Sequence, residues 1–519
     1  MMTHLSALDR VSRLHGNRLA IIDEEQNFTW SEHIDRISRV ADFLLKLGVG
    51  PGDQFGIICE NSFRYTELLH AGYWGGAIPV PINHRLAPPE ILHIMEDAEC
   101  KLLGLGKDFL SLLDAEEIAP WRDRSFYIGP DEKDVLQPQY ESLLSTSDVA
   151  AQQQADEDAL ALLLYTGGTT GRSKGVQLSH RNIVANGMQM AIAMRVDKTD
   201  TYLHAAPMFH AADLLCTAFT LTGAAHAYLP VFAPSKALET IEQYGVTVTM
   251  MAPTMIILCL TDSSFGHFDT SQMRMMLYGS SPMAAEWVQK SIEGFKNTEI
   301  VQGYGLTETS PILTFLDWED HKRAIETGET SILRAAGRPV IGLDMRITDD
   351  LGDELPLGEV GEVTVRGPQV STGYLNRPEE NEASFRNGWF YTGDVGRIDE
   401  GGVMYLMDRK KDMIVSGGEN IYTSEVEAAL YQHPEIQECA VVGVPDEKFG
   451  EALFAVIITS PGSTLTQTGV INHCRKRIGG FKIPRQMDFV EEMPKSAMGK
   501  ILKNELRQIY GAKTDEKTT

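Results

Sequence analysis

The sequence predicts an α/β protein: a large N-terminal domain of mixed sheets covered by helices, with a β-rich subdomain, and a small α+β domain at the C-terminal end. Three observations predict this class. Strand-like and helical patterns alternate from the start of the chain, which favours sheets with helices on their faces. Glycine, proline and short strands then dominate residues 351–405. Finally, 519 residues, 43% of them hydrophobic, are too many for one ordinary core.

The N-terminal part carries clear helix and strand signals. Thr29 and Glu32 have the spacing of a capping box, and apolar residues then recur at helical period until Gly48, a suitable residue for the end of a helix. Short buried strands are expected at residues 55–59, 78–82 and 101–105, with helices at residues 62–73 and 88–98 between them. A parallel or mixed sheet is therefore expected in this region.

The pattern changes towards the C-terminus. Within the β-rich stretch, a short strand is expected at residues 361–366. Beyond it, strands at residues 439–444 and 453–458 alternate with helices that start near Thr423 and Leu465. The change of pattern predicts two domains, residues 1–408 and residues 409–519.

Composition excludes several functions. With 46 lysines and arginines against 72 aspartates and glutamates, the net charge is −26, which repels nucleic acids and anionic membrane surfaces. The six cysteines form no Cys-x-x-Cys pair, so we expect idle thiols in a reducing compartment and not a zinc or disulfide framework. No apolar signal core opens the chain, and no run of about 18 apolar residues could span a membrane. A cytoplasmic protein without nucleic acid partners or an integral membrane segment is expected.

Residues 165–175, Tyr-Thr-Gly-Gly-Thr-Thr-Gly-Arg-Ser-Lys-Gly, form a glycine-rich loop between two apolar strands. Glycines let backbone N–H groups surround phosphate oxygens, threonine hydroxyls add donors, and Lys174 adds a positive charge, so ATP is the expected ligand. The loop is not a Walker A motif, because Lys174 stands between Ser173 and Gly175 and does not open a helix. A turn that merely joins two strands is the alternative.

This loop resembles a signature of the ANL superfamily of adenylate-forming enzymes, which includes acyl-CoA synthetases, adenylation domains and firefly-type luciferases. The family motif is Tyr/Phe-Thr-Ser-Gly-Thr-Thr-Gly-x-Pro-Lys-Gly, and two positions depart from it: Gly167 replaces a serine and Ser173 replaces a proline. Both changes affect the contacts expected with pyrophosphate. By resemblance, the phosphate-binding residues are Thr166, Gly167, Gly168, Thr169, Thr170, Gly171 and Lys174.

Residues 302–308, Gln-Gly-Tyr-Gly-Leu-Thr-Glu, are similar to a second signature of the superfamily. The resemblance implies that adenine stacks on the ring of Tyr304, a flat apolar face between two glycines. Thr307 would donate to a phosphate, and Glu308 would share Mg²⁺ with Thr170, since hard oxygen ligands suit that ion. A turn in which Thr307 caps a helix is the alternative. Further residues expected to border the nucleotide are Gly303, Gly305, Gly279, Ser280 and Ser281.

Residues 389–394, Trp-Phe-Tyr-Thr-Gly-Asp, resemble the segment with which the superfamily holds the ribose hydroxyls. Asp394 would accept hydrogen bonds from both hydroxyls, and Arg409 would make the other ribose contact. Lys411 falls at the hinge position, about which the small C-terminal domain is expected to be mobile. A solvated face is the alternative for this run of charges.

Two motifs nearer the C-terminus are assigned by the same resemblance. Residues 416–421, with Gly417 and Gly418, resemble the loop that lines the pantetheine tunnel, and Asn420 stands where long-chain members often carry tryptophan. Residues 494–501 match the C-terminal signature, in which Lys500 is the catalytic lysine. Basic residues that could receive the CoA phosphates, or could form the edge of an amphipathic helix, are Arg475, Lys476, Arg477, Lys482 and Arg485.

The site of the acid is expected beside residues 207–210, Pro-Met-Phe-His. By resemblance His210 lies at the gate or near the reacting carboxylate, and a packed core histidine is the alternative. Ala211 and Ala212 leave room where some aryl-acid members carry a bulky aromatic residue. A charged Asp213 facing an apolar chain would cost desolvation energy, so it should turn away from the pocket or meet a polar group of the substrate. The first arrangement favours a fatty acid.

The resemblance implies an acyl-CoA synthetase that uses ATP, Mg²⁺ and coenzyme A. A carboxylate would attack the α-phosphate of ATP to give acyl-AMP, and the CoA thiol would then take the acyl group. We expect a medium- or long-chain fatty acid as substrate. The alternatives are an aryl or cinnamate-type acid, an adenylation enzyme that serves a carrier protein, and a non-catalytic nucleotide-binding protein. The partners are thus small molecules, and a homodimer stays an open alternative.

Overall fold

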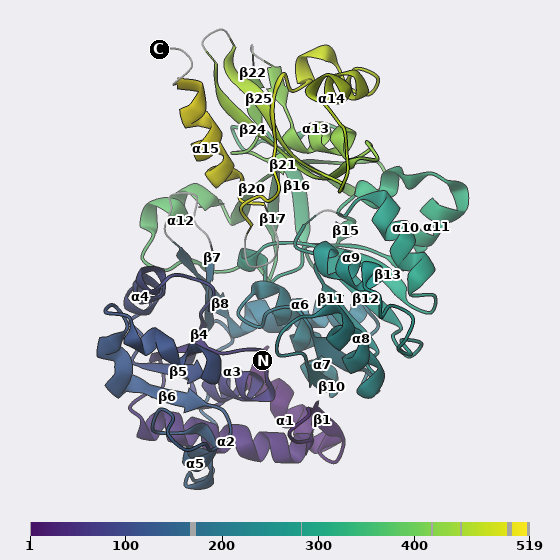
Figure 1. The fold of residues 1–519 in the computed structure, drawn as a ribbon. Coiled ribbons are helices and arrows are strands. Elements are labelled where there is room, and N and C mark those ends of the chain that lie inside the picture. Colours follow the sequence, from purple (N-terminus) through teal and green to yellow (C-terminus); the bar gives the residue numbers. More distant parts are fainter. Residues whose placement is uncertain are drawn as a thin grey trace.

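The structure is a computed structural model that describes residues 2–166, 173–281, 283–416, 419–446, 449–495 and 501–515. A large body of sheets and helices contains the N-terminal and central parts of the chain, and a smaller sheet with its helices lies at the opposite end of the molecule (Figure 1). The predicted class, mixed α/β with a large and a small part, is confirmed.

A nine-stranded sheet forms the centre of the large body, in the order β15-β14-β13-β12-β11-β9-β10-β1-β2. Its middle strands run parallel, whereas β2, β14 and β15 pair antiparallel at the edges. The bounds are β1 Leu19–Ile22, β2 Phe28–Thr29, β9 Thr201–His204, β10 Ala225–Tyr228, β11 Val248–Met251, β12 Met275–Gly279, β13 Glu299–Tyr304, β14 Thr314–Leu316 and β15 Arg338–Pro339.

A second, four-stranded parallel sheet has the order β4-β3-β5-β6. Its strands are β3 Gln54–Ile58, β4 Ile78–Pro81, β5 Leu102–Gly106 and β6 Ser125–Ile128. The first three agree with the predicted strands to within a residue or two. The helices α3 (Phe63–Gly75) and α4 (Pro88–Asp97) occupy the two predicted helical segments between them.

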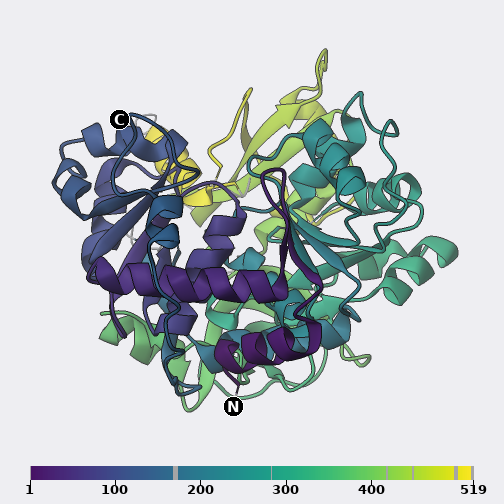
Figure 2. The same cartoon turned by 90° about the horizontal axis from the view of Figure 1, so that it is seen from below.

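Helices cover these sheets, as the alternation of patterns predicts. The Thr29 capping box is confirmed, because Thr29 Oγ1 accepts from the backbone N of Glu32 and Glu32 accepts from the backbone N of Thr29. In Figure 2, the purple helices α1 and α2 cross the underside of the molecule. The remaining bounds are α1 His4–His15, α2 Trp30–Lys46, α5 Tyr140–Ser145, α6 His180–Ala193, α7 Cys216–Thr222, α8 Pro234–Gln243, α9 Pro253–Thr261, α10 Ala285–Gly294 and α11 Trp318–Thr327.

A three-stranded sheet, β18-β8-β7, positions the two sides of the glycine-rich loop. Strand β7 (Leu160–Thr166) pairs antiparallel with β8 (Lys174–Ser179), so that Thr166 lies opposite Lys174. Strand β18 (Gly373–Tyr374) joins the other edge of β8, with Tyr374 opposite Val176. The loop residues between the two strands, 167–172, lie outside the described residues.

The β-rich stretch forms a five-stranded sheet, and the chain then enters another sheet. The first contains β16 Asp344–Thr348, β17 Gly361–Arg366, β19 Phe385–Arg386, β20 Trp389–Ile398 and β21 Met404–Arg409, with α12 at Pro378–Ser384. The second contains β22 Ile414–Ser416, β23 Glu419–Ile421, β24 Ile436–Asp446, β25 Gly450–Thr459 and β26 Gln486–Phe489, with helices α13 Thr423–Leu430, α14 Gln467–Cys474 and α15 Lys503–Asp515. The change of sheet falls between Arg409 and Ile414. The domain boundary at residue 408 stays a prediction.

Two expectations from composition can be compared with the fold. All six cysteines are free thiols, as their spacing predicts. Among the helices in the described parts of the chain, none has both the length and the apolar composition of a membrane span.

A buried ion network ties together the helices next to the four-stranded sheet. Glu67 on α3 is fully buried, and its two carboxylate oxygens accept from Arg36 on α2 at 2.5 and 3.0 Å. Tyr140 on α5 donates to the same carboxylate at 2.7 Å, and Glu141 contacts both Arg36 and Arg64. Burial raises the pKa of Glu67 although Arg36 acts in the opposite direction. The carboxylate therefore depends on this guanidinium for its charge.

Arg36→Met should lower the free energy of unfolding by about 3 to 5 kcal/mol, because Glu67 would remain buried without its ionic partner. Arg13→Met is the matched control, since Arg13 pairs with Asp9 on an exposed helix surface, where the two side chains are 75% and 44% accessible. That change should cost less than about 1 kcal/mol. Urea unfolding of both variants measures the difference, and equal losses would contradict a structural role for the network.

Candidate active site

Asp394 on β20 is a buried carboxylate, 1% accessible, at the junction of two sheets. Tyr304, the last residue of β13, donates its hydroxyl to Oδ2 of Asp394 at 2.5 Å. Arg409 lies opposite Asp394 in the β20–β21 pairing, and its Nε is 2.5 Å from Oδ1. Burial and the charge of Asp394 raise the pKa of Tyr304, so the phenol stays a donor. Three residues predicted to hold adenine and ribose are thus in contact, and Arg409 is not part of a merely solvated charged face.

Glu308 and Lys174 both contact one aromatic side chain, Tyr374. Glu308, 8% exposed, accepts a hydrogen bond from the hydroxyl of Tyr374 at 2.8 Å. The Nζ of Lys174 lies 5.2 Å from the centroid of the same ring, and it forms an ion pair with Glu380 on α12. The structure therefore brings together two predicted phosphate-side residues, and adds Tyr374 and Glu380, which sequence reasoning missed.

The glycines and serines predicted to border the nucleotide lie at the ends of neighbouring strands. Gly279 at the end of β12 is opposite Gly303 of β13, and a Cβ on Gly279 would come within 2.6 Å of the Gly303 carbonyl oxygen. Ser280 then has a positive φ of 66°. Gly305 directly follows β13, and Ser281 is the second residue after β12.

Thr307 begins a short 3₁₀ turn, η4 (Thr307–Thr309), and does not cap a helix. The capping contact comes from Thr309, whose hydroxyl accepts from the backbone N of Leu306 at 3.0 Å. The cap interpretation of Thr307 is therefore wrong.

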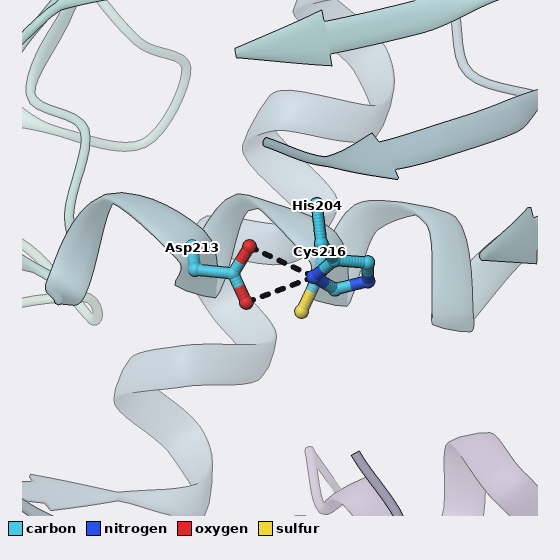
Figure 3. A group of neighbouring side chains, drawn as sticks. All are labelled: His204, Asp213 and Cys216. Atoms are coloured by element: carbon cyan, nitrogen blue, oxygen red, sulfur yellow. Dashed lines mark hydrogen bonds and ion pairs between the residues drawn. The ribbon is translucent and has the colours of Figure 1, made fainter. Parts of the chain in front are cut away.

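His210 is a partly exposed residue and not a packed core histidine. It precedes the 3₁₀ helix η3 (Ala211–Leu215), and its Nδ1 accepts from the backbone N of Ala212 at 3.2 Å. It lines a small cavity of about 20 Å³, room for about one water molecule, between β7, α1, α3 and the η3–α7 segment. Asp213 lines the same cavity, and its direction relative to the bound acid stays a prediction. Its two carboxylate oxygens lie 2.8 and 3.0 Å from Nδ1 of His204 on β9 (Figure 3).

The functional residues predicted near the C-terminus are only partly among the described residues. Lys411 follows β21 on the surface, and Ser416 pairs with Glu419 in the β22–β23 hairpin next to Asn420. Lys482 already pairs with Glu425 at 2.7 Å. The predicted residues that lie outside the described part of the chain are Gly167, Gly168, Thr169, Thr170, Gly171, Gly417, Gly418 and Lys500.

Family comparisons agree with this arrangement. The model of the AMP-binding enzyme family matches residues 8–375, and that of the AMP-binding enzyme C-terminal domain matches residues 425–500. The chain belongs to the AMP-binding enzyme family. The family assignment also confirms the predicted ANL superfamily of adenylate-forming enzymes.

Several relatives of known name are similar over most of their length. A feruloyl-CoA synthase of Amycolatopsis sp is 33% identical over 97% of this chain and 98% of its own. The long-chain-fatty-acid–CoA ligase FadD13 of Mycobacterium tuberculosis is 34% identical over 92% of each chain. The ATP-bound crystal structure of MatB from Rhodopseudomonas palustris superposes with a TM-score of 0.88 at 29% identity, covering 98% of this chain and 99% of that one.

As a member of this family, the chain is an ATP-dependent, AMP-forming acid–CoA ligase that uses ATP, Mg²⁺ and CoA. The alternative of a non-catalytic nucleotide-binding protein is thereby set aside. Glu308 is suited to be a ligand of Mg²⁺. Its carboxylate is buried and accepts one hydrogen bond from the Tyr374 hydroxyl, so further lone pairs remain for a metal ion. The roles of the individual residues towards ATP stay predictions.

Glu380→Gln should strengthen the binding of inorganic tripolyphosphate by about two- to fivefold, because the ion pair with Lys174 competes with any anion at that ammonium group. Glu379→Gln is the matched control, since it removes the same charge from an exposed neighbouring position on α12. Calorimetric titration of the wild type and both variants measures the effect. An equal gain in the two variants would show that only the general charge of α12 matters.

Proposed function

We propose that this ligase activates a compact carboxylic acid that carries polar groups, and that the acid binds beside His210. The observation that carries the proposal is the small size of the cavity there. Polar side chains and the apolar Leu69, Pro81, Leu162, Leu164, Met208 and Leu214 share its wall; the polar ones are His4, Thr66, His70, His210, Asp213 and Thr217. A cavity with room for about one water molecule leaves no space for a long apolar chain, which favours a compact acid.

For the nucleotide, the proposed roles follow the contacts of the described residues. Tyr304 offers its ring to adenine, and Asp394 with Arg409 holds the ribose, since the carboxylate can accept hydrogen bonds from hydroxyl groups while the guanidinium keeps it charged. Lys174 binds the β- and γ-phosphates once it leaves Glu380. Glu308 and Thr170 would hold Mg²⁺, which would supply positive charge beside the phosphate oxygens.

The proposed reaction has two balanced steps. An oxygen of the acid attacks the α-phosphorus of ATP, the bond from that phosphorus to the bridging oxygen breaks, and pyrophosphate leaves. The sulfur of CoA then attacks the acyl carbon, AMP leaves, and the thiol proton is released. Lys500 supports the first step by offsetting charge on the reacting oxygens. Between the two steps, the C-terminal domain, which begins near residue 409, rotates about Lys411. This rotation withdraws Lys500 from the reacting groups and brings residues 416–421 to the site, where they line the path of the CoA thiol.

The names of the relatives include both aryl acids and fatty acids as substrates. A feruloyl-CoA synthase and a 2-succinylbenzoate–CoA ligase of Bacillus cereus, 31% identical, act on oxygen-rich aryl acids by name. A medium- or long-chain fatty acid is the second candidate, supported by FadD13 and by the small side chains of Ala211 and Ala212 beside His210. A fatty acid–[acyl-carrier-protein] ligase, ScoC of Streptomyces coeruleorubidus, is also 31% identical, so a carrier protein is the alternative to CoA as acceptor.

Release of AMP across a panel of acids, with and without CoA, tests the proposed substrate. Compact aryl acids with oxygen substituents should give a higher kcat/KM than any straight-chain acid, and full turnover should require CoA. The opposite pattern would overturn the proposal in favour of the fatty acid. In that case kcat/KM should rise about fourfold for each added CH₂ over several carbons, because each buried CH₂ contributes about 0.8 kcal/mol.

Lys500→Ala should reduce the formation of acyl-AMP by roughly a hundredfold or more, which is the scale of losing a preorganised charge in an active site. Thioester formation from supplied acyl-AMP should continue, because the lysine acts only in the first step. Lys495→Ala, a change at a neighbouring lysine that pairs with Glu438, is the control and should leave both steps intact. Equal losses of both half-reactions in Lys500→Ala, measured separately, would refute the assigned role.

A further inference from the structure

A buried carboxylate lies just before the point where the chain passes from the five-stranded sheet to the C-terminal sheet. Asp408, near the end of β21, is 8% exposed. Its Oδ2 accepts from the backbone N and from the hydroxyl of Thr423, at 2.5 and 2.7 Å, and Thr423 is fully buried. The next residue, Ser424, donates its hydroxyl to the carbonyl oxygen of Met407. These contacts join segments that lie before and after Lys411, the proposed pivot of the rotation.

Asp408 supplies a cap that α13 does not receive from its own sequence. The helix begins at Thr423, and the residue before it, Tyr422, makes no side-chain hydrogen bond to the N–H groups of the first turn. The Asp408 carboxylate binds the first of these N–H groups instead, and its negative charge is favoured at the positive end of the helix dipole. The start of α13 is therefore stabilised by a residue of β21.

A buried lysine supports the same contact from the C-terminal side. The Nζ of Lys503 on α15 lies 2.5 Å from the hydroxyl oxygen of Thr423 and 2.8 Å from Oε1 of Glu427 on α13. Burial lowers the pKa of Lys503, but the negative charges of Glu427 and Asp408 outweigh burial and raise it overall. The charged ammonium donates to the oxygen of Thr423, whose hydroxyl in turn donates to Asp408.

The contact exists in an orientation that matches the first of the two proposed steps. Residues 416–421 are proposed to line the path of the thiol in the second step, yet here Glu419 and Asn420 are exposed, and the adjoining Val415 is 45% exposed. This segment thus faces solvent while Asp408 holds Thr423. A rotation about Lys411 would separate Asp408 from Thr423, because the two residues lie on opposite sides of the pivot.

We propose that Asp408 and Thr423 form a latch that holds the C-terminal domain in the orientation for acyl-AMP formation and opens before thioester formation. The inference rests on the proposed function and adds Asp408 to it as a positioning residue. Asp408 acts through the place of the domain that carries Lys500. Loss of the latch therefore lowers the fraction of molecules in the first orientation and leaves the chemistry of each step unchanged.

Separate measurements of the two half-reactions in Asp408→Asn and Asp408→Ala test the latch, with the acid of the panel that releases most AMP. Formation of acyl-AMP should fall severalfold in Asp408→Asn and about tenfold to a hundredfold in Asp408→Ala, the range of a hydrogen bond to a charged group. Thioester formation from supplied acyl-AMP and CoA should continue at the wild-type rate or faster. Cleavage by trypsin after residues 409–411 of the ligand-free enzyme should accelerate in the same order, because opening exposes this segment.

Asp412→Asn is the matched control, since it makes the same substitution at a side chain that is 12% exposed and pairs with Arg507. Both partners of that pair follow Lys411 and move together, so the ratio of the two half-reaction rates should stay at its wild-type value. Thr423→Val removes the hydroxyl and retains the backbone N–H. It should slow acyl-AMP formation in the wild type and have no further effect in Asp408→Ala, because the two residues act through one contact.

Equal losses of both half-reactions in Asp408→Asn, or the same change of ratio in Asp412→Asn, would overturn the latch. A wild-type rate of acyl-AMP formation in Asp408→Ala would also overturn it. Thermal unfolding reports whether each variant folds, and the near-isosteric Asp408→Asn keeps the test decisive where Asp408→Ala does not fold. A wild type that releases no AMP with any acid would contradict the proposed function itself, which distinguishes that failure from an active wild type with unaffected Asp408 variants.

Discussion

Pairing of buried carboxylates is the constraint on which the arrangement of this protein depends. An ionised carboxylate inside a protein is tolerated only with donors at hand, because its desolvation costs several kcal/mol. Glu67, Asp213, Glu308 and Asp394 are all less than 10% exposed, and each takes its donor from another segment of the chain. Glu67 thereby connects α3 to α2, and Asp213 connects the 3₁₀ helix η3 to strand β9. Asp394 connects the five-stranded sheet to the nine-stranded sheet through Tyr304.

The same pairing has consequences at the nucleotide side. Tyr304 and Arg409 already occupy the two oxygens of Asp394, so a ribose would share an ordered carboxylate and would not have to organise a flexible one. Lys174 is different, because its partner Glu380 is an acid that any phosphate must displace. The ribose side of the site is thus arranged before the nucleotide binds. On the phosphate side, Lys174 must exchange the carboxylate of Glu380 for a phosphate group.

Tyr374 shows how a residue outside every recognisable motif can matter to the site. It reaches Glu308 with its hydroxyl and Lys174 with its ring because β18 joins the edge of β8, nearly 200 residues away along the chain. Glu380 follows on α12 directly after this strand. No local sequence pattern predicts such contacts, since they arise from strand pairing between distant segments.

The sequence by itself determined the family, the reaction class, the α/β architecture and the residues Lys174, Tyr304, Glu308 and Asp394, because these depend on local patterns: glycine spacing, periodicity and short motifs. Even the start of a helix was predictable at Thr29, where the capping box involves residues three apart. Only the tertiary structure decided which side chains meet. That Asp213 lines the cavity and is held by His204, that Tyr374 joins Lys174 to Glu308, and that Thr307 caps no helix all depend on how distant strands align. Such alignment is set by packing and burial summed over the whole core, which no short stretch of sequence contains.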